Sequence, residues 1–251
     1  MQFMILRRSD QVSEADGFPS AELVRALPSA KWLHPSASGL RMTRAAGVWR
    51  VDEELVADAS ELVAGFTFIE AASREEAAQW ASTWPTTDAE GEAVLEVRQA
   101  GCPGGCVGFD MHTLPDGAPA DLKPAQLKPG MQPYAVLLRS DAGSEADLEP
   151  PAFVIDTMNR ANQAGIRAGI ALAGEGLRAS KLGARVKFSG GKPSIIDGPF
   201  TEVKELIAGY WLVQADSMAG AIEWVKRYPF PHPPEMDVAV ELRTVHLPSA
   251  Q

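Results

Sequence analysis

The sequence predicts an α+β protein that is built from two copies of one unit, and three observations lead to this prediction. Strands and helices are expected in the same order on both sides of a segment rich in proline and glycine, residues 99–132. Short stretches of the first part recur in the same order in the second part. A strand expected at 210–215 is apolar on both faces, so both faces require cover from other parts of the chain.

Length and charge limit the class of protein. The chain of 251 residues is long enough for two domains of roughly 100–130 residues, each with its own core. Its net charge of −10 argues against a nucleic-acid-binding surface, since phosphate binding requires a concentrated basic face. Apolar runs fall far short of the roughly 20 residues that span a bilayer, and no basic region precedes an apolar core of signal-peptide length. We therefore expect a cytoplasmic protein without a nucleic-acid or membrane partner.

The first copy is expected at residues 1–98. Its clearest helix begins with a capping box, Ser73 with Glu76, and ends at Pro85, while Ser20 is the expected N-cap of a shorter helix. The expected elements, in order, are a strand at 3–6, a helix at 20–27, strand-like residues at 40–51, a helical stretch at 52–63, a strand at 65–71, the helix that begins at Ser73, and a strand at 92–98.

The second copy is expected at residues 133–251. Gly190 and Gly191 separate two strand-like runs and predict a hairpin, and Pro199 suits the first turn of a short helix. Phe153 is expected among the buried residues of the first helix. The expected elements are a strand at 134–139, a helix at 151–170, hairpin strands at 185–188 and 194–196, a short helix at 200–206, a strand at 210–215, a helix at 217–228, and a strand at 238–245.

Matched segments support the duplication. The run ELVAGF at 61–66 recurs as ELIAGY at 205–210, and Glu96-Val97-Arg98 recurs as Glu241-Leu242-Arg243. The separation between matched segments only grows along the chain, which is typical of a duplication followed by insertions. The first copy is expected to be degenerate and to lack the hairpin. A further match joins Ile5-Leu6-Arg7 to Leu137-Leu138-Arg139.

Each copy has the element order βαββαβ of a ferredoxin-like domain. In a single such domain the two helices cover one face of the sheet, and the other face should be polar. The two-faced apolar strand at 210–215 therefore predicts that the sheets of the two copies pack face to face, as in dimeric α+β barrels. The chain would be a monomer that contains its own pseudo-dimer, with further dimerisation left open.

Four runs in the second copy carry a family resemblance. GEGLR, SGGK, DGPF and KELIAGYW begin at Gly174, Ser189, Asp197 and Lys204. Together they resemble the YCII-related family, in particular its DGPF subgroup, strongly over 133–245 and weakly over 2–98. The resemblance implies a ferredoxin-like fold that dimerises around a cleft, with an activity that is largely unassigned.

The resemblance also implies candidate chemistry. The founding branch of the family has a proposed acid–base pair of histidine and aspartate, and the aspartate corresponds here to Asp197. The helix at 153–170 contains no histidine that could complete the pair. Some family members are similar to sigma-factor-like proteins, which implies a regulatory module as the alternative.

Asp197 is accordingly the candidate catalytic residue. It precedes Gly-Pro and a short helix, so a turn or N-cap role is the alternative. Glu175 and Arg178 flank a tight turn, where they either form an ion pair that lines a pocket or only a surface pair. With Lys204 and Tyr210 they would bound a small-molecule site around Asp197.

Glu241 and Arg243 are ligand-binding candidates of a second kind. They share the inner face of the last strand, and Glu96 and Arg98 repeat the arrangement in the first copy. Polar groups among aromatic side chains are typical of a small-molecule cleft. An ion pair at the interface between the copies is the alternative.

Two cysteines fall in the segment between the copies. Cys102 and Cys106, with His112 close behind, lack the fourth ligand that structural zinc requires. In a cytoplasmic protein such thiols are expected to be free. We therefore expect no metal and no cofactor.

Two classes of function remain open. One is an enzyme whose cleft carboxylate performs an acid–base step of the isomerase, lyase or lactone type, and the other is a non-catalytic ligand-binding or regulatory module. A carboxylate with a perturbed pKa in an enclosed pocket would favour the enzyme. A filled cleft beside an exposed apolar patch would favour the module.

Overall fold

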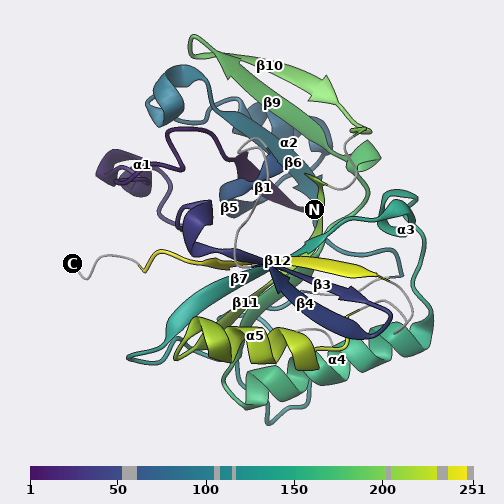
Figure 1. The fold of residues 1–251 in the computed structure, drawn as a ribbon. Coiled ribbons are helices and arrows are strands. Elements are labelled where there is room, and N and C mark those ends of the chain that lie inside the picture. Colours follow the sequence, from purple (N-terminus) through teal and green to yellow (C-terminus); the bar gives the residue numbers. More distant parts are fainter. Residues whose placement is uncertain (53–60, 105–107, 115–116, 202–204, 231–236, 248–251) are drawn as a thin grey trace.

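The computed structural model describes residues 1–52, 61–104, 108–114, 117–201, 205–230 and 237–247. The fold is mixed α+β, as predicted, and contains two six-stranded antiparallel sheets that lie one above the other in Figure 1. Helix α2 packs on the first sheet, whereas α4 and α5 pack on the second. The helices are α1 (Ala21–Ala26), α2 (Arg74–Ala81), α3 (Ala142–Glu145), α4 (Ala152–Arg167) and α5 (Met218–Arg227).

Each sheet combines strands from both parts of the chain. The first has the order β10-β9-β6-β1-β5-β2 and the second β4-β3-β12-β7-β11-β8. The strands of the first sheet are β1 (Gln2–Arg8), β2 (Lys31–Trp32), β5 (Val63–Glu70), β6 (Val94–Gln99), β9 (Ala184–Ser189) and β10 (Lys192–Asp197). Those of the second are β3 (Leu40–Ala45), β4 (Val48–Asp52), β7 (Gln132–Arg139), β8 (Ala171–Gly176), β11 (Ile207–Ala215) and β12 (Val238–Thr244).

Side-chain caps begin the predicted helices where the sequence places them. Ser20 accepts a hydrogen bond from the backbone N–H of Leu23, and Ser73 accepts one from that of Glu76. These bonds satisfy N–H groups that have no partner inside the helix. Both predicted caps are confirmed.

The hairpins of the two parts are exchanged between the sheets. The predicted hairpin β9–β10 pairs through β9 with β6 of the first sheet. A hairpin in the first part, β3–β4, pairs through β3 with β12 of the second sheet. The prediction that the first part lacks a hairpin is therefore wrong. Its turn is formed by Ala46 and Gly47, both with positive φ, and alanine at such a position gives no sequence signal for a turn.

Both faces of β11 are buried, as its sequence predicts. Tyr210 faces the first sheet, and its ring lies 4.9 Å from that of Phe66 between centroids. The next residue, Trp211, faces the helices and lies 4.7 Å from the ring of Tyr228. A hydrophobic core that contains Met4 and residues of the second sheet fills the space between the sheets. Apolar burial on this scale is the main favourable contribution to folding.

The pairing registers make the two sheets equivalent strand by strand. Leu6 of β1 pairs with Phe66 and with Glu96 on its two sides. Leu137 of β7 pairs in the same way with Tyr210 and Glu241. Leu6 is therefore equivalent to Leu137, one residue earlier than the sequence match predicted. The counterpart of Arg139 is Arg8, whereas the sequence match predicted Arg7. A one-residue shift moves a side chain to the opposite face of a sheet.

The segment between the two parts is attached to the fold. Phe109 exchanges two backbone hydrogen bonds with Gly174, at the outer edge of β8. Leu122 and Ala125 are buried in the core shared by the sheets. The segment is thereby held against the second sheet, and its residues Cys102, Pro103 and Gly108 line the candidate site.

Candidate functional site

A cavity of about 420 Å³ lies at the edge of the second sheet. Its walls are the strands β8 and β11, the first turns of α4, and the segments that precede α4 and contain Cys102. Glycine at 174, 176 and 209 allows close packing here, since a Cβ atom at these positions would contact neighbouring side chains or the backbone. Apolar side chains form most of the wall, namely Leu138, Leu148, Phe153, Val154, Ile155, Met158, Leu177 and Trp211.

Glu175 of β8 brings a carboxyl group to this wall. It is half-buried, and its Oε1 accepts a hydrogen bond of 3.0 Å from the backbone N–H of Gly176. Backbone N–H groups of Gly101 and Gly108 also contact the carboxylate. Burial nevertheless raises the pKa of Glu175 from 4.5 to about 7, because desolvation outweighs these hydrogen bonds. Near neutral pH its protonated and ionised forms are therefore both populated.

Gly108 allows the connecting segment to lie directly on Glu175. A Cβ atom at position 108 would stand 1.9 Å from Oε2 of Glu175. Real Cβ contacts are never this short, so any other residue would displace either the segment or the carboxylate. The close approach adds to the burial of Glu175, and desolvation by burial is the physical cause of its raised pKa.

Arg178 does not pair with Glu175. Its Nε donates a hydrogen bond of 2.9 Å to Oδ1 of Asp147, and its Nη2 bonds to the other oxygen. Asp147 lies in the segment before α4, which the sequence analysis did not connect with β8. Hydrogen bonding to Arg178 holds the pKa of Asp147 below its usual range. The ion pair anchors this segment beside the cavity.

Asp197 lies away from Glu175. It is the last residue of β10 in the first sheet, where its side chain is 66% exposed and 3.4 Å from Nη2 of Arg74. It is not among the described residues that line the cavity. The predicted cluster of Asp197 with Glu175, Arg178 and Tyr210 is therefore not formed, because the hairpin exchange carries Asp197 to the other sheet. Lys204 lies outside the described residues.

Tyr210 is the cross-strand neighbour of Glu175, but its ring is enclosed between the sheets. Burial raises the pKa of its hydroxyl well above the ordinary value of 10. The cavity is lined instead by the following residue, Trp211. The indole Nε1 of Trp211 donates to Oδ1 of Asn162 on α4, which also accepts from the hydroxyl of Tyr228. These hydrogen bonds fix the orientation of the indole ring.

Glu241 and Arg243 are fully buried between the sheets. Arg243 donates a hydrogen bond of 2.8 Å to Glu241, and Arg139 donates one of 2.7 Å to its other oxygen. Glu96 and Arg98 form the equivalent pair in the first sheet at 2.9 Å. None of these side chains lines the described cavities, so they correspond to the ion-pair alternative of the sequence analysis.

The sequence analysis missed several residues of the cavity. Phe153, predicted to be buried, is 68% exposed at its rim, and Leu148 is 65% exposed beside it. Asn159 and Asn162 lie one helical turn apart on α4 and both face the cavity. This spacing of two amides on the apolar side of a helix was the available sequence signal.

Cys102 also lines the cavity and is disulfide-bonded. The expectation of free thiols is therefore wrong for Cys102, since it rested on the expected compartment and not on the geometry of the loop. Cys106 lies outside the described residues. Within the described part of the chain no three His, Cys, Asp or Glu side chains are grouped so as to hold a metal ion.

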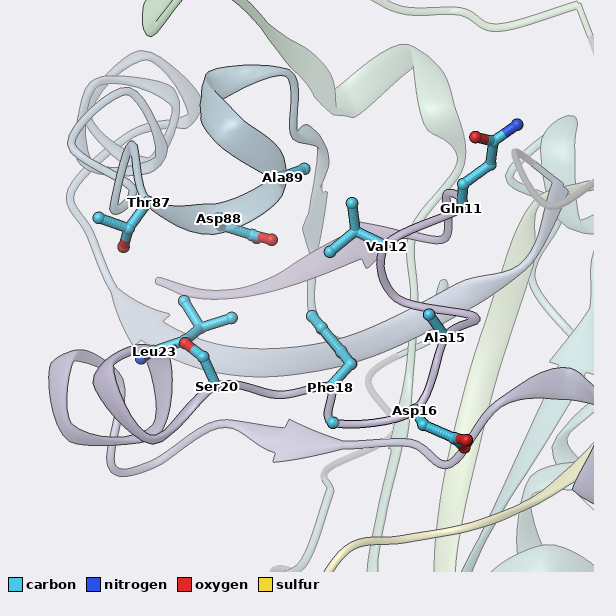
Figure 2. Close-up of a pocket in the computed structure, with 11 residues that line it drawn as sticks. Gln11, Val12, Ala15, Asp16, Phe18, Ser20, Leu23, Thr87, Asp88 and Ala89 are labelled. Carbon is cyan, nitrogen blue, oxygen red and sulfur yellow. Dashed lines mark hydrogen bonds between the residues drawn. The ribbon is translucent and has the colours of Figure 1, made fainter.

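A second cavity, of about 390 Å³, lies in the first part of the chain between the segments 11–23 and 87–89 (Figure 2). Val12, Phe18 and Leu23 surround it. The carboxylate of Asp88 at its edge is already bonded to Arg7 and to the indole of Trp84. Asp16, the other carboxylate of its described lining, is exposed, so this cavity offers no counterpart of the half-buried Glu175.

Comparison with known protein families gives a match in the second part of the chain. Residues 134–241 match the YCII-related domain. The matched region contains β8, α4 and β11, which form most of the cavity that Glu175 faces. No curated protein matches the chain. In the described part of the chain, no helix combines the length and the apolar character needed to cross a membrane.

Proposed function

We propose that the YCII-related domain at residues 134–241 binds a small organic molecule in the 420 Å³ cavity and that Glu175 transfers a proton to or from it. The observation that carries the proposal is the half-buried carboxyl group of Glu175 at the wall of a mostly apolar cavity, where burial raises its pKa to about 7. A general acid–base group works best when its pKa lies near the working pH. Perturbed carboxyl groups in pockets are also enriched at catalytic sites.

The make-up of the cavity supports a small-molecule ligand. Its wall is largely aliphatic and aromatic, and a few polar groups, Glu175, Asn159 and Asn162, are placed on different sides. Apolar surface would bind the body of a ligand, and convergent polar groups would orient it. The reaction class that fits is an isomerase, lyase or lactone-type step, in which one carboxyl group moves a proton next to a carbonyl.

The site would belong to one half of a duplicated fold. In the first sheet the four strands of the first part lie in the order β6-β1-β5-β2, and in the second sheet those of the second part lie in the order β12-β7-β11-β8. Counted along each part of the chain, both orders are fourth, first, third, second, which is that of a ferredoxin-like domain. We assign these domains to 1–98 and 133–251, joined by 99–132, with the first as a degenerate YCII-like copy of the DGPF type. The shared core between the sheets supports a pseudo-dimer of the α+β barrel type.

Proton transfer is tested by exchange of ligand protons in D₂O. Carbonyl compounds that bind the protein in a ligand-observed NMR screen are incubated with it, and the loss of their C–H signals is followed. We expect catalysed exchange with the natural protein and none with Glu175→Gln, although the variant still binds. Equal exchange rates for both proteins would reject Glu175 as the proton-transferring group.

Binding at the cavity is tested by filling it. Asn159→Trp places an indole in the cavity, and Arg160→Trp places the same side chain on the exposed side of the helix. We expect the first to abolish binding and the second to leave it unchanged. Binding that survives Asn159→Trp would place the ligand elsewhere.

A non-catalytic module is the second candidate, and the exposed rim favours it. Leu148 and Phe153 present apolar side chains to solvent next to the cavity. Exposed apolar groups beside a cleft are typical of docking sites for a protein or peptide. Under this alternative Glu175→Gln would leave function intact, whereas Leu148→Ser with Phe153→Ser would remove it.

A further inference from the structure

We propose that the ligand of the cavity is an apolar molecule with one protonated amino group, which binds beside the carboxylate of Glu175. The inference rests on the proposed function, since it requires that the cavity is a binding site. It adds the charge class of the ligand, which follows from the charges and the apolar groups at the walls.

The charges around the cavity are of one sign. Three carboxylates, those of Asp141, Glu149 and Glu175, belong to its described lining, which contains no lysine, arginine or histidine. Arg178, the cationic residue that follows β8 in the chain, is already paired with Asp147. An anionic ligand would therefore meet repulsion without a cationic partner, whereas a cation would be attracted.

Glu175 is the carboxylate best placed to contact a cation. Asp141 is the N-cap of α3, where its Oδ1 accepts hydrogen bonds from the backbone and the hydroxyl of Ser144. Glu149 is exposed at the rim, where water weakens its attraction. Glu175 is half-buried, so an ion pair with it gains from the lower dielectric.

The remaining wall fits an apolar body. Leu138, Val154 and Met158 offer aliphatic surface, and the ring of Trp211 is held in place by Asn162. An indole face also attracts cations, so it would favour an amine over an alcohol of the same shape. A volume of about 420 Å³ accommodates a molecule of one or two rings.

The affinity for an amine should rise with pH. An alkylamine stays protonated up to a pKa of about 10.4, so only the protein titrates between pH 6 and pH 8. The groups that face Glu175 are the backbone N–H groups of Gly101, Gly108 and Gly176 and the side chain of Tyr210, which stays neutral in this range. Deprotonation of Glu175 is then the change that strengthens binding.

Three probes of the same shape test the charge class. Phenylbutylamine, phenylbutanol and phenylbutanoate are titrated against the full chain, with ligand-observed NMR as the readout. We expect the amine to bind at least about tenfold more tightly than the alcohol and the carboxylate to bind most weakly. The preference for the amine should be several-fold larger at pH 8 than at pH 6.

Two variants assign the effect to Glu175 and to this cavity. Glu175→Gln should remove the preference for the amine and its pH dependence, while the alcohol still binds. The same replacement at Glu223, exposed on α5 and paired with Lys226, is the control and should change nothing. Leu148→Lys at the exposed rim should weaken amine binding and strengthen carboxylate binding. This second test remains valid even if Glu175→Gln fails to fold.

The outcomes separate this inference from the proposed function. If the carboxylate or the alcohol binds as tightly as the amine, the cationic class is rejected and the proposed binding site stands. The same holds if Glu175→Gln and Leu148→Lys both keep the preference for the amine. If none of the probes binds at millimolar concentration, the cavity is not a binding site and both proposals are rejected.

Discussion

The guanidinium of Arg98 donates a hydrogen bond of 2.6 Å to the main-chain carbonyl of Arg178, which follows β8 in the other sheet. Arg243 makes the equivalent contact with the carbonyl of His34, which follows β2. Each arginine thus joins its own sheet to the opposite half of the chain. The buried Glu-x-Arg pairs are best understood as part of the joint between the halves.

The first prediction concerns this joint. Arg98→Met removes the hydrogen-bonded partner of Glu96, which is 0% exposed and keeps longer contacts with Arg8 and Arg185. It also leaves the carbonyl of Arg178 without its donor. We expect a loss of about 3–5 kcal/mol in the free energy of unfolding, measured in urea. Adding Glu96→Gln should restore part of it, because the buried charge is then gone. A loss below about 1 kcal/mol for Arg98→Met would show that the contact contributes little.

The second prediction concerns the pH dependence of stability. The pKa of Glu175 is about 7 in the folded protein and 4.5 ordinarily, so between these values the folded state holds a proton that the unfolded chain has released. The free energy of unfolding therefore falls as pH rises from about 4.5 to about 7, by up to roughly 1.4 kcal/mol per pKa unit. Glu175→Gln should remove this contribution.

The measurement is urea unfolding at pH 5 and pH 8 for the natural protein and for Glu175→Gln. The stability of the natural protein relative to the variant should be higher at pH 5, and other titrating groups cancel in the comparison. Glu223→Gln on exposed α5 is the control and should follow the natural protein. Parallel pH profiles for all three proteins would contradict the raised pKa.

The third prediction concerns Asp197. Because its side chain is 66% exposed and its pairing with Arg74 is a surface contact, Asp197→Asn should change the free energy of unfolding by less than about 1 kcal/mol. Ligand binding at the cavity should also be unaffected, in contrast to Glu175→Gln. Loss of binding in a stably folded Asp197→Asn protein would show that Asp197 belongs to the binding site.

The fourth prediction concerns the exchanged hairpin. Phe188 of β9 is buried at the core of the first sheet, whereas Ile195 of β10 is half exposed. Phe188→Ala should cost about 3–5 kcal/mol, and Ile195→Ala less than about 1 kcal/mol, in urea unfolding. Similar costs for the two variants would argue that β9 does not pack on the first sheet.

The fifth prediction concerns independent folding. A fragment of residues 133–251 lacks β6, the pairing partner of β9, and β3, the pairing partner of β12. We expect it to self-associate or to remain incompletely folded, as judged by size-exclusion chromatography and amide NMR. A monomeric fragment with a dispersed spectrum would show that the hairpin exchange is dispensable.

Local patterns in the sequence were sufficient for much of the fold. The α+β class, the caps at Ser20 and Ser73 and the two-faced burial of β11 follow from periodicity and capping, which depend on neighbouring residues. Strands β2 and β8 were not predicted, and the run 40–51, predicted as one strand-like stretch, forms the hairpin β3–β4. Glu175 could be named as a site candidate because it stands in an unusual glycine-rich run beside a turn. Its partners could not be named.

Tertiary structure decided which sheet each hairpin joins, and this choice determined which residues surround the candidate site. The alternation in β9 predicts a strand but not the sheet edge that it joins, since hydrogen-bond donors and acceptors are the same at every edge. That choice placed Asp197 beside Arg74 and left Arg178 to pair with Asp147. The raised pKa of Glu175 likewise depends on tertiary structure, because its cause is burial, and the segment that contains Gly108, distant in sequence, lies against the carboxylate only in the folded chain.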